Sequence, residues 1–179
     1  MKLPKQKKCR WCEGDFMPRN SFQVVCSPSC AVNYNRDKEV VKKVKTMAEG
    51  LKTHSDYLKI LQVVFNSFIR LRDKDQPCIS CGTTNKDIKY DAGHFYSVGA
   101  YPNLRFNELN VHRQCSNNCN MHKSGNFAEY NIKLPERIGI EAYQKLMNER
   151  NIPLKLSIPE IKELIKHYKN KTKELKLNP

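Results

Sequence analysis

Long hydrophobic runs are absent from this chain of 179 residues, whose longest apolar stretches, such as Val63-Val64-Phe65, span three residues. A helix that spans a bilayer needs roughly 20 apolar residues, so we expect no membrane span and no membrane partner. The chain starts with a basic segment and then reaches Cys9, where a secretory signal would carry its apolar region. We therefore expect a cytoplasmic protein.

Acidic residues are scarce relative to basic ones. Lys and Arg number 32 against 18 Asp and Glu, which gives a formal net charge of +14. Like charges at this density repel one another in a folded chain, so a polyanionic partner such as DNA is expected. We expect no small-molecule cofactor.

Cysteine is well represented, and all eight cysteines fall in close pairs. Pairs separated by two or three residues are typical of tetrahedral structural zinc, with disulfides or free thiols as the alternatives. A zinc ion with four thiolates carries a charge of −2, so two such sites lower the net charge to about +10. We predict two structural Zn²⁺ sites, formed by Cys9, Cys12, Cys26 and Cys30 and by Cys78, Cys81, Cys115 and Cys119.

The pattern predicts four segments of an α+β protein. Residues 1–35 form a small N-terminal zinc ribbon, and residues 36–75 form a helical connector that includes a possible dimerisation helix. Residues 76–131 form a core with the second zinc site, and residues 132–179 form the C-terminal helices.

The ribbon is expected to cover its metal-centred hairpin with Phe16, Phe22, Val24 and Val25. Its basic residues favour DNA contact, although such ribbons also dock proteins or only stabilise a fold. Trp11 could join that contact or cover the zinc site. The basic residues that surround its cysteines are Lys5, Lys7, Lys8, Arg10 and Arg19.

The connector reads as two helices. Residues 36–54 are polar, and their charges form a solvated face or, alternatively, a phosphate-binding arm. Ser55 is predicted to cap a second helix to about Asp73, in which apolar residues recur at three- and four-residue steps. That stripe is typical of a core-facing helix, although part of it could contact the same helix of a second subunit.

Short strands are predicted near 87–91, 93–96 and 109–112, followed by a helix that starts at Cys119 or Asn120. Two more helices are predicted, over about 135–150 and 158–175. Ser157 and Glu160 have capping-box spacing at the start of the second.

The second set of cysteines surrounds residues that suit phosphodiester hydrolysis. That reaction needs a base to activate water and a divalent cation on the phosphate. His94 suits the first role, because a histidine is largely neutral at cytoplasmic pH. Asp91 and Asn120 offer the oxygen ligands that Mg²⁺ prefers, and Asn120 directly follows the last thiol.

The order of these motifs resembles the HNH, or ββα-metal, endonucleases, in particular the phage Holliday-junction endonuclease VII. Over roughly residues 5–175 the chain resembles the lambdoid phage NinG (Rap) family of recombination proteins. The stretches that suggest this family are Pro77-Cys-Ile-Ser-Cys-Gly82, Asp91-Ala-Gly-His94 and His122-Lys-Ser-Gly-Asn126. The HNH pattern is carried by Cys78-x2-Cys81, Asp91-Ala-Gly-His94, Asn110-x4-Cys115 and Cys119-Asn120-x2-Lys123.

The resemblance implies an HNH-like ββα-metal core in which His94 is the general base and Asp91 and Asn120 hold a catalytic Mg²⁺ or Mn²⁺. Asn110 would orient the base through its backbone. The implied substrates are Holliday junctions and D-loops. The alternatives are that Asp91 is a turn residue and that Asn120 is only a helix cap.

The chain departs from the HNH pattern in two places. Gly93 stands directly before His94, where many of these enzymes have an acidic or histidine metal ligand, so Asp91 has to take that role. The last pair of cysteines is separated by three residues instead of two, which is expected to bulge the turn and shift Asn120 slightly.

Further candidates surround this constellation. His112 could face the site or replace a thiol at the zinc. Arg105, Arg113, His122 and Lys123 are candidates for contacts to DNA phosphates, with solvated charges as the alternative.

The sequence therefore predicts a metal-dependent, structure-selective endodeoxyribonuclease for branched recombination intermediates. Resolution of a junction needs two coordinated nicks, so a homodimer is expected, with the 55–73 helix as the first candidate interface. The alternatives are a non-catalytic zinc-stabilised DNA-binding protein and a sequence-specific HNH endonuclease for linear duplex.

Overall fold

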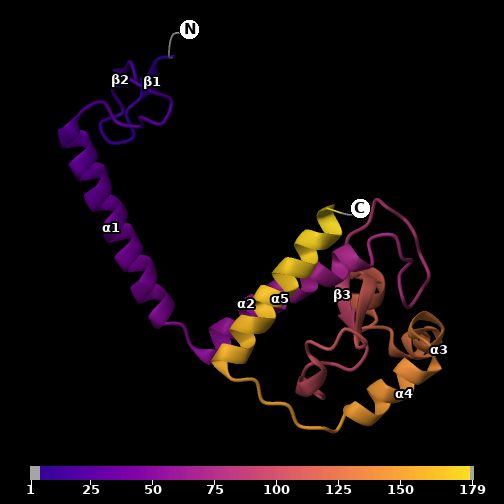
Figure 1. Ribbon diagram of the computed structural model, residues 1–179. Coiled ribbons are helices and arrows are strands. Elements are labelled where there is room, and N and C mark those ends of the chain that lie inside the picture. Colours follow the sequence, from indigo (N-terminus) through magenta and orange to yellow (C-terminus); the bar gives the residue numbers. More distant parts are fainter. Residues whose placement is uncertain (1–4, 178–179) are drawn as a thin grey trace. The chain divides into compact units, whose positions relative to one another are not determined.

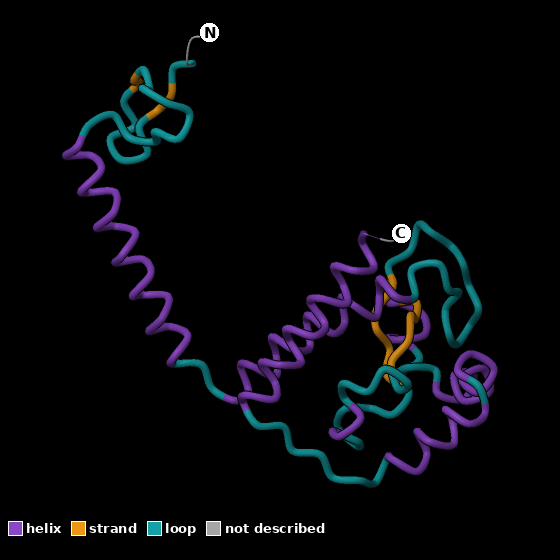
Figure 2. The backbone as a smooth tube through the Cα atoms, viewed as in Figure 1, coloured by secondary structure: helices purple, strands orange, loops and turns teal. Residues whose placement is uncertain are grey.

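The structure is a computed structural model that describes residues 5–177, and it has the mixed α+β class that the sequence predicts (Figures 1 and 2). The chain divides into two compact units, residues 1–52 and 53–179. Within residues 5–177, no helix combines the length and the apolar character that crossing a membrane requires.

The first unit holds a short hairpin and one long helix. Strand β1 (Lys7–Lys8) pairs antiparallel with β2 (Asp15–Phe16). Helix α1 (Pro28–Gly50) begins before the last thiol of the first cysteine set, because the Ser27 side chain accepts the N–H of Cys30 at 3.2 Å. The helix therefore starts earlier than residue 36, where the helical connector is predicted to begin.

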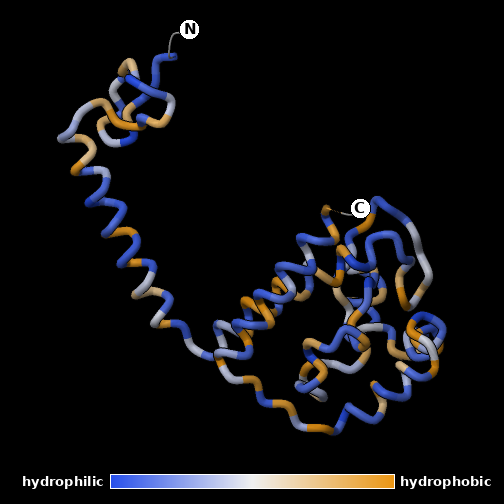
Figure 3. The backbone as a smooth tube through the Cα atoms, viewed as in Figure 1, coloured by the Kyte–Doolittle hydropathy of each residue, from blue (hydrophilic) through white to orange (hydrophobic). Residues whose placement is uncertain are grey.

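Apolar cover in the first unit differs from the prediction. Phe16, Val24 and Val25 are half-buried, but the Phe22 side chain is 91% exposed, so its predicted place over the hairpin is wrong. The loop around it is instead held by polar contacts, because Asn20 Oδ1 accepts the N–H groups of Phe22 and Gln23. Helix α1 is largely hydrophilic along its length (Figure 3), and Cys30 is its only buried residue.

Helix α2 (His54–Arg72) opens the second unit. Its cap is Thr53, not Ser55 as predicted. The Thr53 side chain accepts the N–H of Asp56 at 3.3 Å, and the Asp56 carboxylate accepts the N–H of Thr53 at 3.0 Å. This reciprocal pair satisfies two N–H groups of the first turn, which Ser55, already inside the helix, cannot do.

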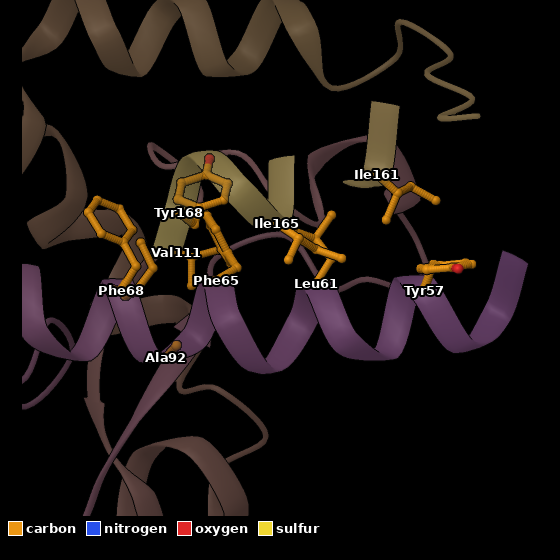
Figure 4. Close-up of a cluster of buried hydrophobic side chains, with 10 residues drawn as sticks. Tyr57, Leu61, Phe65, Phe68, Ala92, Val111, Ile161, Ile165 and Tyr168 are labelled. Carbon is orange, nitrogen blue, oxygen red and sulfur yellow. The ribbon is translucent and has the colours of Figure 1, made fainter. Parts of the chain in front are cut away.

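The apolar stripe of α2 is core. Helix α5 (Ile158–Leu177) runs parallel to α2, and Phe65 packs edge-on against Tyr168 with ring centroids 4.9 Å apart (Figure 4). This part of the stripe is filled from within the chain, whereas Val63, on the same helix, is exposed, so the use of α2 as a dimer interface stays a prediction. The buried residues of α2 are Tyr57, Leu61, Phe65, Phe68 and Ile69, and those of α5 are Ile161, Ile165 and Tyr168.

A two-stranded antiparallel sheet lies beside α2. Strand β3 (Tyr90–His94) pairs with β4 (Val111–Cys115), so that His94 lies opposite Val111 and Asp91 opposite Gln114. One strand therefore replaces the two predicted near 87–91 and 93–96, and the last strand lies slightly later than 109–112. Ala92 and Val111 join the α2–α5 core, which fixes the sheet against α2.

The connections after each strand are helical. A 3₁₀ turn, η1 (Pro102–Leu104), lies between the strands, and a π-helical turn, η2 (Ser116–His122), follows β4. The sequence predicts a helix from Cys119 or Asn120, but the structure has the turn η2 there, and helix α3 (Phe127–Ile138) begins only at Phe127.

Helices α3 and α4 (Ile140–Glu149) replace the single helix predicted over 135–150. The break falls at Gly139, whose φ of 86° is a conformation that other residues rarely adopt. These helices enclose a second core. At the start of α5 one half of the predicted capping box is present, because the Glu160 carboxylate accepts the N–H and the hydroxyl of Ser157. The buried residues of this core are Ile79, Phe95, Tyr96, Leu104, Tyr130, Leu134 and Leu146.

Candidate metal centre and surrounding residues

The eight thiols form two groups, each with its four sulfur atoms within 4.8 Å of one another. The sulfur of Cys26 lies 3.6 Å from that of Cys12 and 3.5 Å from that of Cys30, and the sulfurs of Cys81 and Cys115 are 3.7 Å apart. A tetrahedral zinc ion with bonds of about 2.3 Å holds its thiolates about 3.8 Å apart. Both groups fit zinc, and the separations exceed the roughly 2.05 Å of a disulfide.

Backbone N–H groups point at the sulfur atoms. In the first group the N–H of Cys26 donates to the sulfur of Cys9, and in the second the N–H of Cys115 donates to that of Cys78. Burial raises the pKa of the Cys9 thiol, but the backbone donors outweigh it and lower that pKa to about 6. Such donors favour the thiolate, the form that binds a metal.

The π-helical turn η2 explains the three-residue gap in the last pair of cysteines. The sulfur of Cys115 accepts the N–H of Cys119 at 3.4 Å, which closes the turn around the extra residue. The predicted bulge is therefore present. Because Asn120 follows directly on Cys119, a zinc ion in the second group would hold Asn120 in place.

Asp91 and Asn120 meet beside the second group of thiols, although 29 residues separate them in the sequence. The Asn120 amide donates to Asp91 Oδ2 at 3.2 Å, and the hydroxyl of Ser116 donates to the same oxygen. Lys89 Nζ lies 3.8 Å from the other oxygen of Asp91. Two side chains with oxygen donors and a nearby cation thus gather at one place.

Gly93 is required by the packing of Gln114. A Cβ atom at residue 93 would lie 2.3 Å from Gln114 Oε1, closer than such atoms approach. The Gln114 side chain is fully buried, and its amide donates to the Ser80 hydroxyl and to the Gly125 carbonyl. No acidic ligand fits directly before His94, because a side chain there would displace Gln114.

His94 lies at the end of β3 and is partly buried. Its Nε2 is 3.0 Å from the Arg105 carbonyl, which only accepts, so Nε2 carries a proton and Nδ1 is the basic nitrogen of the neutral ring. Burial lowers the pKa of His94. The bond to the carbonyl opposes this effect, and the charge of Arg105 adds to it.

Asn110 holds the chain that follows His94. Its side chain is fully buried, accepts the N–H of Tyr96 at 2.8 Å and donates to the carbonyls of Tyr96 and Leu104. Its own carbonyl accepts the N–H of Phe95, the residue after His94. These bonds join the two ends of the loop that carries Arg105, the partner of His94.

His112 belongs to a buried network, not to a zinc site. The second metal group consists of four cysteines, so the alternative in which His112 replaces a thiol is wrong. Its Nδ1 is 3.0 Å from the Tyr130 hydroxyl, which donates to the Gly93 carbonyl at 3.1 Å. Burial, with the charge of Arg72, lowers the pKa of His112 to about 3.

The network makes stability depend on pH. His112 has an ordinary pKa near 6.5 in the unfolded chain and about 3 in the fold, so the fold favours the neutral ring. Its stabilisation is complete above pH 6.5 and is lost as the pH falls toward 3, by roughly 1.4 kcal/mol per pH unit. We expect the free energy of unfolding of the zinc-loaded protein to drop by about 2 kcal/mol between pH 6.5 and pH 5.

Chemical denaturation at the two pH values measures this drop. His112→Asn keeps a donor for Tyr130 without a titrating ring, so the drop should shrink by about that amount. His167→Asn, on the exposed side of α5, is the matched control and should behave as the wild type. An equal drop in wild type and His112→Asn would contradict the prediction.

The four candidates for phosphate contact differ in their surroundings. His122 and Lys123 are exposed at the end of η2. Arg105 donates to Gln62 at 2.6 Å, and the guanidinium of Arg113 lies 3.6 Å from the centre of the Tyr90 ring and donates to the carbonyl of Lys74. Contact of these four residues with DNA remains a prediction.

The structure thus brings two of the predicted site residues into direct contact and leaves the third apart from them. Asp91 and Asn120 touch, whereas His94 lies at the end of the same strand and is bound to Arg105. Two polar neighbours were missed, Ser116 and Tyr130. Ser116 follows the thiol of Cys115 directly, which is a local signal for it, but the contacts of Tyr130 depend on long-range packing.

Comparison with known proteins decides the family. The chain matches the family model described as Bacteriophage Lambda NinG protein over residues 1–50 and 36–178. It is 37% identical to Protein ninG of Escherichia phage lambda, over 98% of this chain and 96% of that one. The chain belongs to the NinG family.

Other NinG proteins are similar over nearly their whole length. Protein ninG of Escherichia phage 933W is 36% identical over 98% of this chain and 96% of its own. Protein ninG of Salmonella phage P22 is 37% identical over 96% of this chain and 92% of its own. No solved structure matches the chain. The predicted family is therefore confirmed.

Proposed function

We propose that this NinG protein is a metal-dependent endonuclease that cuts branched DNA, namely Holliday junctions and D-loops of phage recombination, in the host cytoplasm. The observation that carries the proposal is the contact of Asn120, next to the second group of thiols, with Asp91 on the strand that ends at His94. A rigid scaffold of this kind can keep reacting groups in a fixed geometry.

His94 is the proposed general base. Its Nε2–H is engaged by the Arg105 carbonyl, which leaves Nδ1 to take a proton from water. Its lowered pKa keeps the ring neutral at physiological pH, so that the base is ready without a prior deprotonation. Asn110 supports this role by holding the segments on either side of the Arg105 loop.

Asp91 and Asn120 are the proposed holders of Mg²⁺ or Mn²⁺. One carboxylate and one amide oxygen are the donor types that hard cations bind, with water completing the shell. When bound, such an ion would stabilise charge on the scissile phosphate and on the leaving oxygen. Ser116 orients the Asp91 carboxylate through its hydroxyl, and Lys89 lies where it can approach the phosphate backbone.

The sheet offers a place where both groups could act on one phosphate. Asp91 and His94 are three residues apart on β3, so their side chains leave the strand on opposite faces. Strand β3 pairs only with β4 in the described part of the chain, which leaves its outer edge without a partner strand. The proposal therefore requires the scissile phosphate to lie along that edge, where it would meet both side chains.

DNA is proposed as the partner because of the net positive charge of the chain, and a homodimer is proposed because junction resolution needs two nicks. A formal charge of +14, or about +10 with two zinc sites, suits a polyanion. Paired nicks in a symmetric junction need two active sites related by a two-fold axis. Much of the α2 stripe is buried against α5, so the proposed dimer would use the exposed remainder of α2, which includes Val63, or another surface.

The test is cleavage of a four-way junction and of a linear duplex with matched arms. Zinc-loaded protein is expected to nick the junction only when Mg²⁺ or Mn²⁺ is added, and to leave most of the duplex intact. Binding without cleavage at any concentration of either ion would favour a non-catalytic DNA-binding protein. Cleavage of linear duplex at one sequence would favour a site-specific HNH endonuclease.

A further inference from the structure

Phe22 holds its ring in solvent at the tip of a loop in the zinc ribbon. Its side chain is 91% exposed, against 61% for Met17 and 39% for Trp11 in the same unit. Keeping an aromatic ring in water forgoes the stabilisation that burial gives. An exposed ring on a backbone that is held in place is therefore a candidate for contact with a partner.

The backbone beneath Phe22 is held by side chains. Asn20 Oδ1 accepts the N–H groups of Phe22 at 3.0 Å and of Gln23 at 2.9 Å, which is an Asx turn. Lys7 Nζ reaches across from β1 and donates to the carbonyl of Ser21 at 2.7 Å. The residue that presents the ring is thus fixed from both sides.

The loop is also tied to the hairpin and to the thiol group. Gln23 accepts the N–H of Arg19 at 2.7 Å and donates to the carbonyl of Val25 at 2.9 Å. The N–H of Arg10 donates to the carbonyl of Val24 at 3.0 Å, and Val24 lies two residues before Cys26. A zinc ion in the first group would therefore fix the loop, and with it the position of the Phe22 ring.

Basic residues belong to the same loop and hairpin as the ring. The loop includes Arg19, whose N–H is bound to Gln23, and Lys7 Nζ donates to the carbonyls of Ser21 and Gln23 on either side of Phe22. A protein-binding face usually gathers several apolar side chains around a buried anchor, with few lysines. A single ring among cations is the arrangement that binds nucleic acid, because cations meet the phosphates while the ring stacks on a base. Between residues 5 and 35 five basic residues (Lys5, Lys7, Lys8, Arg10 and Arg19) outnumber the acidic Glu13 and Asp15, and the local charge stays slightly positive when the −2 of a zinc ion on four thiolates is counted.

We propose that Phe22 stacks on an unpaired or unstacked nucleobase, so that the N-terminal ribbon recognises single-stranded DNA and branch points. In an intact duplex each base face is covered by its neighbours, and entry of a ring between them costs a few kcal/mol. At a single strand or a branch point the face is already open. The inference rests on DNA as the partner, as the proposed function does, but not on catalysis.

Binding of the full zinc-loaded chain, without added Mg²⁺ or Mn²⁺, tests the inference. Fluorescence anisotropy would compare a single-stranded oligonucleotide, a four-way junction and a linear duplex. Phe22→Ala is expected to weaken binding to the first two by roughly five- to 100-fold, which is the usual effect of losing one stacked base. Duplex binding should change by less than about twofold, because it rests on phosphate contacts.

Matched variants separate stacking from simple loss of apolar surface. Phe22→Trp should retain binding, whereas Phe22→Leu should behave as Phe22→Ala. Met17→Ala, another exposed apolar residue of the ribbon, should bind as the wild type. A 2-aminopurine base at the branch point should lose fluorescence on binding of wild type but not of Phe22→Ala.

Two outcomes would overturn the inference: equal binding of all three DNAs by Phe22→Ala and wild type, or equal loss of duplex and single-strand binding. Zinc content of two ions per chain shows that a variant has folded. Failure of the proposed function looks different, because then no branched DNA is cut with Mg²⁺ while Phe22→Ala still loses single-strand binding.

Discussion

His94→Ala is expected to lower the rate of junction cleavage at saturating protein by about 10²- to 10⁴-fold, the usual contribution of a general base. Junction binding should change by less than about twofold, because the ring contacts Arg105 within the protein. Single-turnover cleavage and anisotropy, measured on the same junction with Mg²⁺, give the two quantities.

A second variant keeps this prediction independent of folding. In His94→Gln the side-chain amide can still donate to the Arg105 carbonyl, but it has no nitrogen that takes up a proton near neutral pH. Its rate should fall as far as that of His94→Ala. His167→Ala, on the exposed face of α5, is the matched control and should cut at the wild-type rate. If His94→Gln cuts within a few-fold of wild type, His94 is not the base.

The pH dependence adds a further check on the same residue. Because burial lowers the pKa of His94 below 6.5, the unprotonated ring persists to more acidic pH than in free histidine. The cleavage rate should therefore hold to more acidic pH than it would with a histidine of ordinary pKa, and decline only as the His94 ring takes up a proton. In His94→Gln that decline should be absent.

The site was predictable where short spacings determine it. Two cysteine pairs suited to sharing one ion bring distant segments together, and Asn120 follows the last thiol, so its approach to Asp91 could be expected. The extra residue between Cys115 and Cys119 likewise predicts a widened turn, and the π-helical geometry of η2 accommodates it.

Features that depend on long-range packing were not predictable in this way. The α2 stripe has the same pattern whether it meets α5 or a second subunit, and only the complete fold selects α5. In the sequence, Gly93 stands where an acidic or histidine metal ligand is expected. The structure explains the glycine by the side chain of Gln114 on the neighbouring strand, which leaves no space for a Cβ atom. The exposure of Phe22 follows from the polar bonds of its loop, not from its hydrophobicity.

The two zinc sites should have separable effects on the protein. Structural zinc contributes about 10–16 kcal/mol in small zinc domains, which matches or exceeds the whole stability of a typical domain, about 5–15 kcal/mol. In the second group, three of the four thiols are buried, those of Cys78, of Cys115 at the end of β4 and of Cys119 in η2. Cys119→Ser is therefore expected to lose one of two zinc ions, to unfold the segment around residues 77–126 and to abolish cleavage.

Helices α2 and α5 should survive that loss, because their contact is made by Tyr57, Phe65, Ile161 and Tyr168 and by no thiol. Hydrogen exchange should show lost protection in β3 and β4 but retained protection in the middle of α2. Cys30→Ser is the matched variant in the first unit, which forms a separate compact unit. It should also lose one zinc ion, yet leave the protection of the second unit unchanged.

Cleavage then distinguishes the two roles of zinc. Cys119→Ser removes the anchor of Asn120 and should be inactive at any Mg²⁺ concentration, whereas Cys30→Ser should keep the chemistry of the second unit and cut at raised protein concentration. Metal analysis must show two zinc ions in wild type and one in each variant. If β4 is protected as well in Cys119→Ser as in wild type, the fold of the site does not depend on this ion. The apolar contacts of the sheet with α2 would then suffice to hold Asp91 and Asn120 together.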